Sequence, residues 1–148
     1  MEIIIRGAGG PGRRCRTDAE HENVHVGLQR GKEPDELRPG DVQTTEWRIV
    51  VDVIDRDSAP DFRGPHVQGR RGERFVYLTW GEVGSDGSFA MFRRAKLPLS
   101  RVDPALITEA DGAGAALVAR VAITGGDGGP VCATAGPDLL TWSVERAT

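Results

Sequence analysis

Residues 61–81 read DFRGPHVQGRRGERFVYLTWG, and this stretch decides the fold. It is a dense run of strand-forming residues, because aromatic and β-branched side chains suit a pleated, half-buried surface. The segment Gly69-Arg70-Arg71-Gly72 interrupts the run. A three-residue loop with Gly72 in the left-handed conformation explains that glycine, whereas a two-residue primed turn would force positive φ on two arginines. The stretch therefore predicts a long β-hairpin.

The alternation of apolar and polar side chains that is typical of a β-strand recurs along the rest of the chain. We expect strands over the following segments: 2–6, 24–29, 47–54, 115–123, 130–134 and 139–145. Residues 89–97 are good helix formers, but their alternation favours a strand, and both readings stay open. Residues 31–41 contain Pro34 and Pro39, which predict a polar loop.

One helix is expected, near residues 103–111. Asp103 is a suitable N-cap, and Pro104 suits the first helical turn. About eight or nine short strands with this single helix predict an all-β fold, either an antiparallel β-sandwich or a small closed barrel. Periodicity does not separate these two architectures. The length of 148 residues and the lack of internal repeats predict a single domain over residues 1–148.

Composition excludes some classes of protein. The net charge of −3 argues against a nucleic-acid partner, which requires a dominant basic field. No apolar run approaches the roughly 18 residues of a membrane span, and the N-terminus lacks the apolar core of a signal peptide. We therefore expect a cytoplasmic protein without a membrane partner. In that reducing compartment Cys15 and Cys132 are expected to be free thiols.

A glycine pattern near the N-terminus resembles a dinucleotide-binding loop. Gly7, Gly9 and Gly12 have the spacing G-x-G-x-x-G directly after a predicted strand. That motif needs an amphipathic helix next, but residues 13–22 show no apolar stripe of helical period. A glycine turn explains the pattern better, and we expect no cofactor.

Residues 21–25 read HENVH, which matches the zinc-protease pattern H-E-x-x-H. The chemistry requires both histidines on one face of a helix. Val24, Val26 and Leu28 instead alternate with polar residues or glycine, as in a strand. We therefore expect no metal site here.

Three runs of sequence carry a resemblance to a known family. They are residues 23–31 (NVHVGLQRG), residues 61–81 and residues 89–97 (FAMFRRAKL). Through these runs the chain resembles a family of small uncharacterised bacterial proteins, a domain of unknown function. The resemblance implies one compact domain and supplies no catalytic residues.

Cationic side chains gather in or beside the predicted strands of 61–81 and 89–97. We select Arg63, His66, Arg74 and Arg93 as candidate ligand-binding residues. Guanidinium groups bind carboxylate or phosphate through paired hydrogen bonds, and an arginine among apolar neighbours, as Arg93 would be, needs an anionic partner. The leading hypothesis is a binding module for a small molecule bearing phosphate or carboxylate. A solvated basic face, or an internal salt bridge of Arg93, explains the same residues.

A protein-interaction or structural module is a second hypothesis. It would use Phe62, Tyr77 or Trp80 as exposed aromatic anchors. It predicts a contiguous apolar surface patch and a homodimer or hetero-complex.

A small hydrolase or isomerase is a third hypothesis. His66 would act as acid and base, with Asp61 or Glu73 orienting its ring. Glu73 is one position out of register for that pairing, and no nucleophile lies nearby in the sequence. The catalytic residues of such an enzyme stay unknown.

Overall fold

The computed structural model describes residues 1–9, 24–39, 44–55, 58–123 and 140–146. In these ranges the chain is mostly β-strand with one short helix, as the sequence predicts. The elements are β1 (Glu2–Gly9), β2 (Val24–Arg30), β3 (Glu33–Pro39), β4 (Thr44–Val50), β5 (Asp52–Ile54), β6 (Asp61–Arg63), β7 (Phe75–Val83), β8 (Phe89–Pro98), α1 (Pro104–Ala110), β9 (Ala115–Ile123) and β10 (Leu140–Arg146). The described residues thus form ten strands, where eight or nine were expected.

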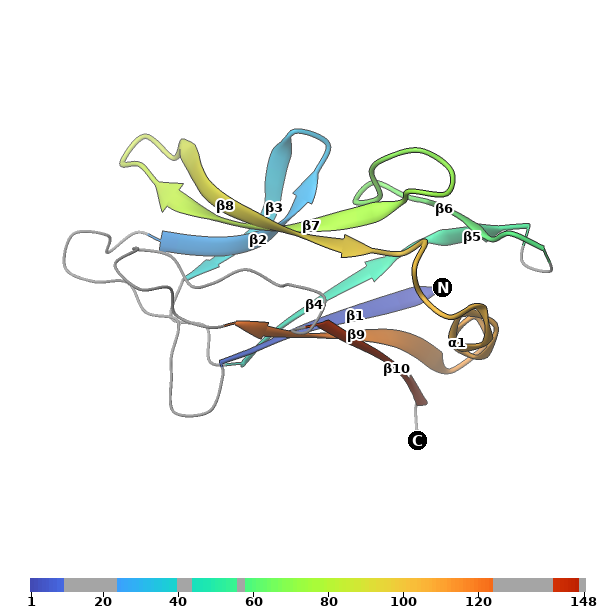
Figure 1. The fold of residues 1–148 in the computed structure, drawn as a ribbon. Coiled ribbons are helices and arrows are strands. Elements are labelled where there is room, and N and C mark those ends of the chain that lie inside the picture. Colours follow the sequence, from blue (N-terminus) through green and yellow to red (C-terminus); the bar gives the residue numbers. More distant parts are fainter. Residues whose placement is uncertain (10–23, 40–43, 56–57, 124–139, 147–148) are drawn as a thin grey trace.

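Two sheets lie one above the other in a sandwich-like arrangement (Figure 1). One sheet has the strand order β10-β9-β1-β4, and the other has the order β3-β2-β7-β8. The two-stranded ribbon of β5 and β6 continues the structure at one end. Neither four-stranded sheet closes into a barrel within the described ranges.

One strand pair departs from the antiparallel pairing that we expect for most of the fold. β1 runs parallel to β9, with Glu2 opposite Ala116 and Gly9 opposite Ile123. Parallel neighbours need a long connection, and here it contains the entire second sheet. Alternation along a strand is the same for both directions of pairing, so periodicity alone did not reveal this geometry.

The core lies between the two sheets. Ile3 and Ile5 of β1 face it from one sheet, while Leu28 of β2 and Leu78 of β7 face it from the other. Trp47 on β4 is the largest fully buried side chain, with 0% of its surface exposed. Because both layers contribute to one cluster, hydrophobic burial holds the sheets together.

Helix α1 begins where the sequence predicts. The Asp103 side chain accepts a hydrogen bond of 2.9 Å from the backbone N–H of Ala105, and Pro104 occupies the first turn. Ile107 and Ala110 are its buried residues and belong to the core cluster. The helix therefore packs one face against the end of the sandwich (Figure 1).

The long hairpin predicted for residues 61–81 was wrong in its first half. β6 is only three residues long and pairs with β5, and a single bridge between Gln68 and Phe75 joins the segment to β7. The chain turns after β6, where the Val67 N–H donates 3.1 Å to the Gly64 carbonyl. Pro65 lies in this turn and has no N–H for a sheet ladder, which ends the strand.

The glycines of the 69–74 loop adopt the left-handed conformation. Gly72 has φ +87°, as predicted, and Gly69 has φ +86°. A Cβ at Gly69 would lie 2.4 Å from the Glu73 carbonyl oxygen, whereas a Cβ at Gly72 would meet nothing within 4 Å. A side chain at Gly72 would therefore meet backbone strain alone, whereas one at Gly69 would meet the same strain and a steric collision.

We expect Gly72→Ala to lower the free energy of unfolding by about 1 kcal/mol, which is the conformational penalty of a left-handed alanine. Gly69→Ala should cost at least about 2 kcal/mol, because the same penalty is joined by displacement of the loop backbone. Urea denaturation of both variants measures the difference. Equal losses would show that the close approach at Gly69 does not exist.

Residues 33–39 form strand β3, although the sequence predicted a loop there. β3 is an edge strand, where proline is tolerated because one side of the backbone needs no ladder hydrogen bonds. A register shift on β2 between Val26 and Leu28 and a positive φ of 51° at Glu36 make the pairing irregular. These features concealed the strand from the proline-based prediction.

The remaining sequence motifs have clear outcomes where the structure describes them. Gly7 and Gly9 lie within β1, so they are strand residues. His25 lies on strand β2, and residues 89–97 form a strand, β8. The following residues and segment lie outside the described ranges: Gly12, Cys15, His21, Glu22, Cys132 and 130–134.

Candidate functional site

Arg74 is held by a buried carboxylate. Its Nε donates 2.9 Å to Asp61, whose side chain is only 2% exposed, and a second nitrogen lies 3.4 Å from the other carboxylate oxygen. The guanidinium also donates to the Gly69 carbonyl, and the Arg74 backbone N–H donates 2.9 Å to the Ser100 hydroxyl. Arg74 therefore ties β6, the 69–74 loop and the chain after β8 together.

The ionised form of Asp61 is favoured by this arrangement. The hydrogen bond from Arg74 lowers the pKa of Asp61, against the opposing effect of burial. Arg63 lies on the same side, with its Nε 3.8 Å from Asp61, but its side chain is 65% exposed. Asp61 thus neutralises Arg74 closely and Arg63 only at long range.

His66 contacts a carboxylate that the sequence did not suggest. Its Nε2 lies 2.8 Å from Asp35 on β3, not beside Asp61 or Glu73. Asp35 was overlooked because the sequence predicted a loop at residues 31–41. The contact links the turn after β6 to β3, the edge strand of the sheet β3-β2-β7-β8. No local sequence pattern indicates this contact, because the two partners are 31 residues apart.

Arg93 lies on β8 opposite Trp80 of β7. Its side chain is outside the described part of the structure, as is that of Trp80. Its proposed internal salt bridge or ligand contact therefore stays a prediction.

A pocket of about 1030 Å³ lies beside Arg74. It is formed by the 69–74 loop, the start of β7, the end of β8 with the residues after it, and β10. β8 and β10 are edge strands of the two different sheets, so the pocket opens at the seam of the sandwich. Its volume is comparable with that of small-molecule sites in proteins. Of the three selected residues whose side chains the structure describes, Arg63, His66 and Arg74, only Arg74 lines it.

The pocket is rich in positive charge. Among the described residues, four cationic ones line it, namely Arg70, Arg74, Lys96 and Arg101, together with one carboxylate, Glu73. Lys96 and Arg101 were not selected from the sequence. The alternation along β8 places the Lys96 side chain on the strand face that Leu97 does not occupy. Nothing in the sequence indicated that residue 101 returns to the 69–74 loop.

The lining cations differ in how firmly they are held. Arg70 pairs with Glu73 at 2.9 Å, and this bond lowers the pKa of Glu73, but the two side chains are 85% and 68% exposed. Such exposed pairs exchange partners at little cost. Lys96 lies over the Phe75 ring at 4.0 Å, and Arg101 makes no hydrogen bond or ion pair to any residue that the structure describes. Lys96, Arg101 and Arg70 are therefore available to an anion, whereas Arg74 is already committed to Asp61.

One wall of the pocket is apolar. Leu140 and Trp142 of β10 share a strand face and are partly buried against the core. Phe75 and Pro98 approach from the other sheet. Strands from both sheets thus place hydrophobic side chains next to the cations.

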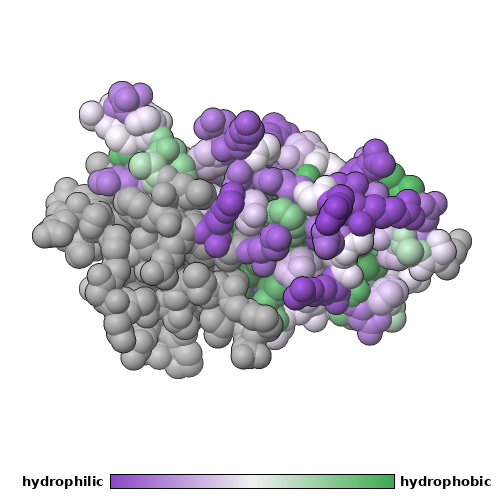
Figure 2. Space-filling model, turned by 45° about the horizontal axis from the view of Figure 1, so that its top comes forward, coloured by the Kyte–Doolittle hydropathy of each residue, from purple (hydrophilic) through white to green (hydrophobic). Residues whose placement is uncertain are grey.

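Cationic and aromatic side chains also lie on the outer face of the sheet β3-β2-β7-β8. Arg94 lies 4.2 Å from the Tyr77 ring centroid, and the Phe75 and Tyr77 rings meet edge to face at 4.7 Å. Figure 2 shows that the described part of the surface in this view is largely hydrophilic, with small hydrophobic areas between polar side chains. Phe62, expected as an exposed anchor, is 1% exposed and belongs to the core. That part of the interaction-module prediction was wrong.

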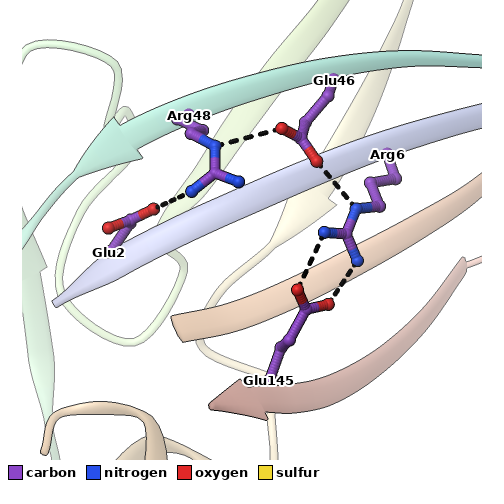
Figure 3. Close-up of polar contacts among 5 residues, drawn as sticks. All are labelled: Glu2, Arg6, Glu46, Arg48 and Glu145. Atoms are coloured by element: carbon purple, nitrogen blue, oxygen red, sulfur yellow. Dashed lines mark hydrogen bonds and ion pairs between the residues drawn. The ribbon is translucent and has the colours of Figure 1, made fainter. Parts of the chain in front are cut away.

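The other sheet carries an ion-pair network on its outer face (Figure 3). Arg6 of β1 binds Glu145 of β10 through two nitrogens and Glu46 of β4 at 2.9 Å. Arg48 bridges Glu46 at 3.0 Å and Glu2 at 2.8 Å. Arg6 and then Arg48 lower the pKa of Glu46. Because each cation here has carboxylate partners, the network joins strands and offers no free charge to a ligand.

The described residues contain no group of three His, Cys, Asp or Glu side chains placed to hold a metal ion. No helix in the described ranges is long and apolar enough to cross a membrane.

Comparisons with known proteins identify the family and no activity. The model of a family of unknown function, DUF5990, matches residues 1–145, so the chain belongs to that family. No curated protein and no solved structure matches the chain.

Proposed function

We propose that this member of a family of unknown function is a binding module for a small anionic molecule, and that the ligand occupies the pocket between β8, β10 and the 69–74 loop. The observation that carries the proposal is the set of lining cations, of which Arg101 has no partner among the described residues and Arg70 has only an exposed one. An anion that enters the pocket would supply these cations with a charged hydrogen-bond partner. Charged hydrogen bonds of this kind contribute about 1.5–3 kcal/mol each when they are well formed.

We propose different tasks for the individual cations. Lys96 and Arg101 would bind the anion directly, because neither is held by a carboxylate in the described part of the chain. Arg70 would exchange Glu73 for the ligand. Arg74 would keep its bond to Asp61 and fix the loop that carries Arg70.

A mutagenesis experiment tests the proposal. Inorganic phosphate is titrated into the protein at low ionic strength and its affinity is measured by calorimetry. We expect Arg101→Ala and Lys96→Ala each to weaken binding about tenfold, which corresponds to one lost charged contact of about 1.4 kcal/mol.

Arg63→Ala is the matched control, because it also removes an exposed arginine but lies outside the pocket lining. Its phosphate affinity should equal that of the wild type. An equal loss in all three variants would mean that phosphate responds only to net charge. Lack of phosphate binding by the wild type would refute an anion site altogether.

The other function classes receive weaker support. Among the side chains whose burial the structure describes, the large exposed hydrophobic ones are Val50 and Ile54, which is a small apolar surface for a protein interface. His66 does contact a carboxylate, as a general base would, but it does not line the pocket. The ligand-binding function therefore accounts best for the arrangement.

A further inference from the structure

The composition of the pocket restricts the chemistry of its ligand. A site for an inorganic anion needs only cations and backbone N–H groups around it. Here the cations Lys96 and Arg101 share the pocket with Trp142, Leu140 and Phe75. The apolar wall would remain in water beside a bare phosphate or carboxylate.

We infer that the ligand is an aromatic anion, a molecule with a phosphate or carboxylate group attached directly to, or one bond from, a flat ring. This inference rests on the proposed function and deepens it. The anionic group lies against Lys96 and Arg101, and the ring lies against Trp142 and Leu140. Ring–ring contact and the removal of apolar surface from water both favour such a molecule over the bare anion.

The origin of the apolar wall supports this assignment. Leu140 and Trp142 are two residues apart on β10, so both side chains project from the same face of the strand. Both are only partly buried although they pack against the core cluster. Among the strands that the structure describes, β10 is the edge strand of its sheet, so none of them covers these side chains on the outer edge. A ring would cover part of the surface that the core leaves exposed.

Phe75 contributes a different contact. Lys96 already lies over its ring at 4.0 Å, and Tyr77 meets its edge. The ring therefore holds the ammonium group in place at the pocket. An anion bound by Lys96 is consequently brought close to aromatic surface.

A series of three ligands tests the inference on the unmodified protein. Inorganic phosphate has the charge without a ring, phenol has the ring without a charge, and phenyl phosphate has both. We expect phenyl phosphate to bind about tenfold more tightly than inorganic phosphate, from the added ring contact. Phenol should show no measurable binding at the same concentrations.

Two variants localise the ring. In Trp142→Ala the ratio between the phenyl phosphate and phosphate affinities should fall from about ten towards one. Leu140→Ala should reduce the ratio by a smaller factor, and it serves if the first variant does not fold. His66→Ala, outside the pocket, should leave the ratio unchanged.

The outcomes separate the two proposals. Equal affinity for phosphate and phenyl phosphate overturns the aromatic ligand but leaves the anion site standing. An unchanged ratio in both β10 variants also overturns it. If neither phosphate nor phenyl phosphate binds, both proposals fail.

Discussion

Replacing Trp47 by alanine is expected to lower the free energy of unfolding by about 4 kcal/mol, in the range for removal of a large buried aromatic side chain. Trp47 is 0% exposed and stands on β4 between the two sheets. Its neighbours in the core cluster come from both layers, so the cavity cannot close by the movement of one side chain. Urea denaturation followed by circular dichroism measures the loss.

Trp47→Phe is the matched control. The indole N–H of Trp47 has no hydrogen-bond partner in the described structure, so phenylalanine removes an unsatisfied donor together with part of the ring. We expect a loss of less than about 2 kcal/mol, because these two effects oppose each other. A loss below about 1 kcal/mol in Trp47→Ala would mean that this residue does not bridge the two sheets.

The second large effect concerns Asp61. Asp61→Asn should lower the free energy of unfolding by about 3 kcal/mol, because it leaves the guanidinium of Arg74 without its charge partner. The carboxylate is 2% exposed and the arginine 18%, so solvent replaces little of the lost interaction. Loss of this pair also frees the 69–74 loop, which Arg74 anchors at the Gly69 carbonyl.

The same pair gives the protein a defined response to acid. The pKa of Asp61 is lower in the folded state than in the unfolded chain, where an aspartate titrates near about 3.9. The pair's contribution to stability is therefore complete above that value and is lost as the pH falls through the lower, folded pKa. Asp61→Asn should show a shallower decrease of stability below about pH 4 than the wild type.

Glu145→Gln is the control for the acid experiment. The bond from Arg6 lowers the pKa of Glu145 too, but this carboxylate is exposed and its ion pairs are screened by salt. We expect a small change in the free energy of unfolding that disappears in 1 M salt, where the Debye screening length is about 3 Å. If Asp61→Asn behaves in the same way as Glu145→Gln, the buried pair has no special role.

The sequence was most informative where local chemistry alone determines structure. The Asp103-Pro104 cap predicted α1, the alternation of residues 115–123 predicted β9, and the glycine at position 72 predicted its left-handed turn. Each of these depends on neighbours within a few residues. The mostly β fold with one helix follows from the same local rules.

Features that depend on distant pairing were not predictable. The parallel pairing of β1 with β9 joins residues more than a hundred positions apart and leaves no trace in periodicity. Pro65 ended the predicted hairpin strand, while Pro34 was compatible with β3 because that strand lies at an edge. Proline therefore had opposite consequences in two places, and only the tertiary context distinguished them.

The residues selected from the sequence and the described lining of the pocket share Arg74, and the anionic ligand stays a proposal. The cationic character of residues 61–81 and 89–97 led to Arg74 and to an anionic ligand, but Lys96 and Arg101 complete the pocket. Arg63 and His66 lie outside its lining because the expected hairpin does not form. Asp61 lies in the predicted hairpin stretch, but its strand pairs with β5, and Asp35 comes from β3, which the sequence predicted as a loop.

The most direct test of the anion site is a nuclear magnetic resonance titration of the isotopically labelled wild-type protein with inorganic phosphate at low ionic strength. We expect saturable chemical-shift changes at Lys96 and Arg101, with little change at Arg63. Shifts that are linear in concentration and spread over all exposed arginines would contradict it.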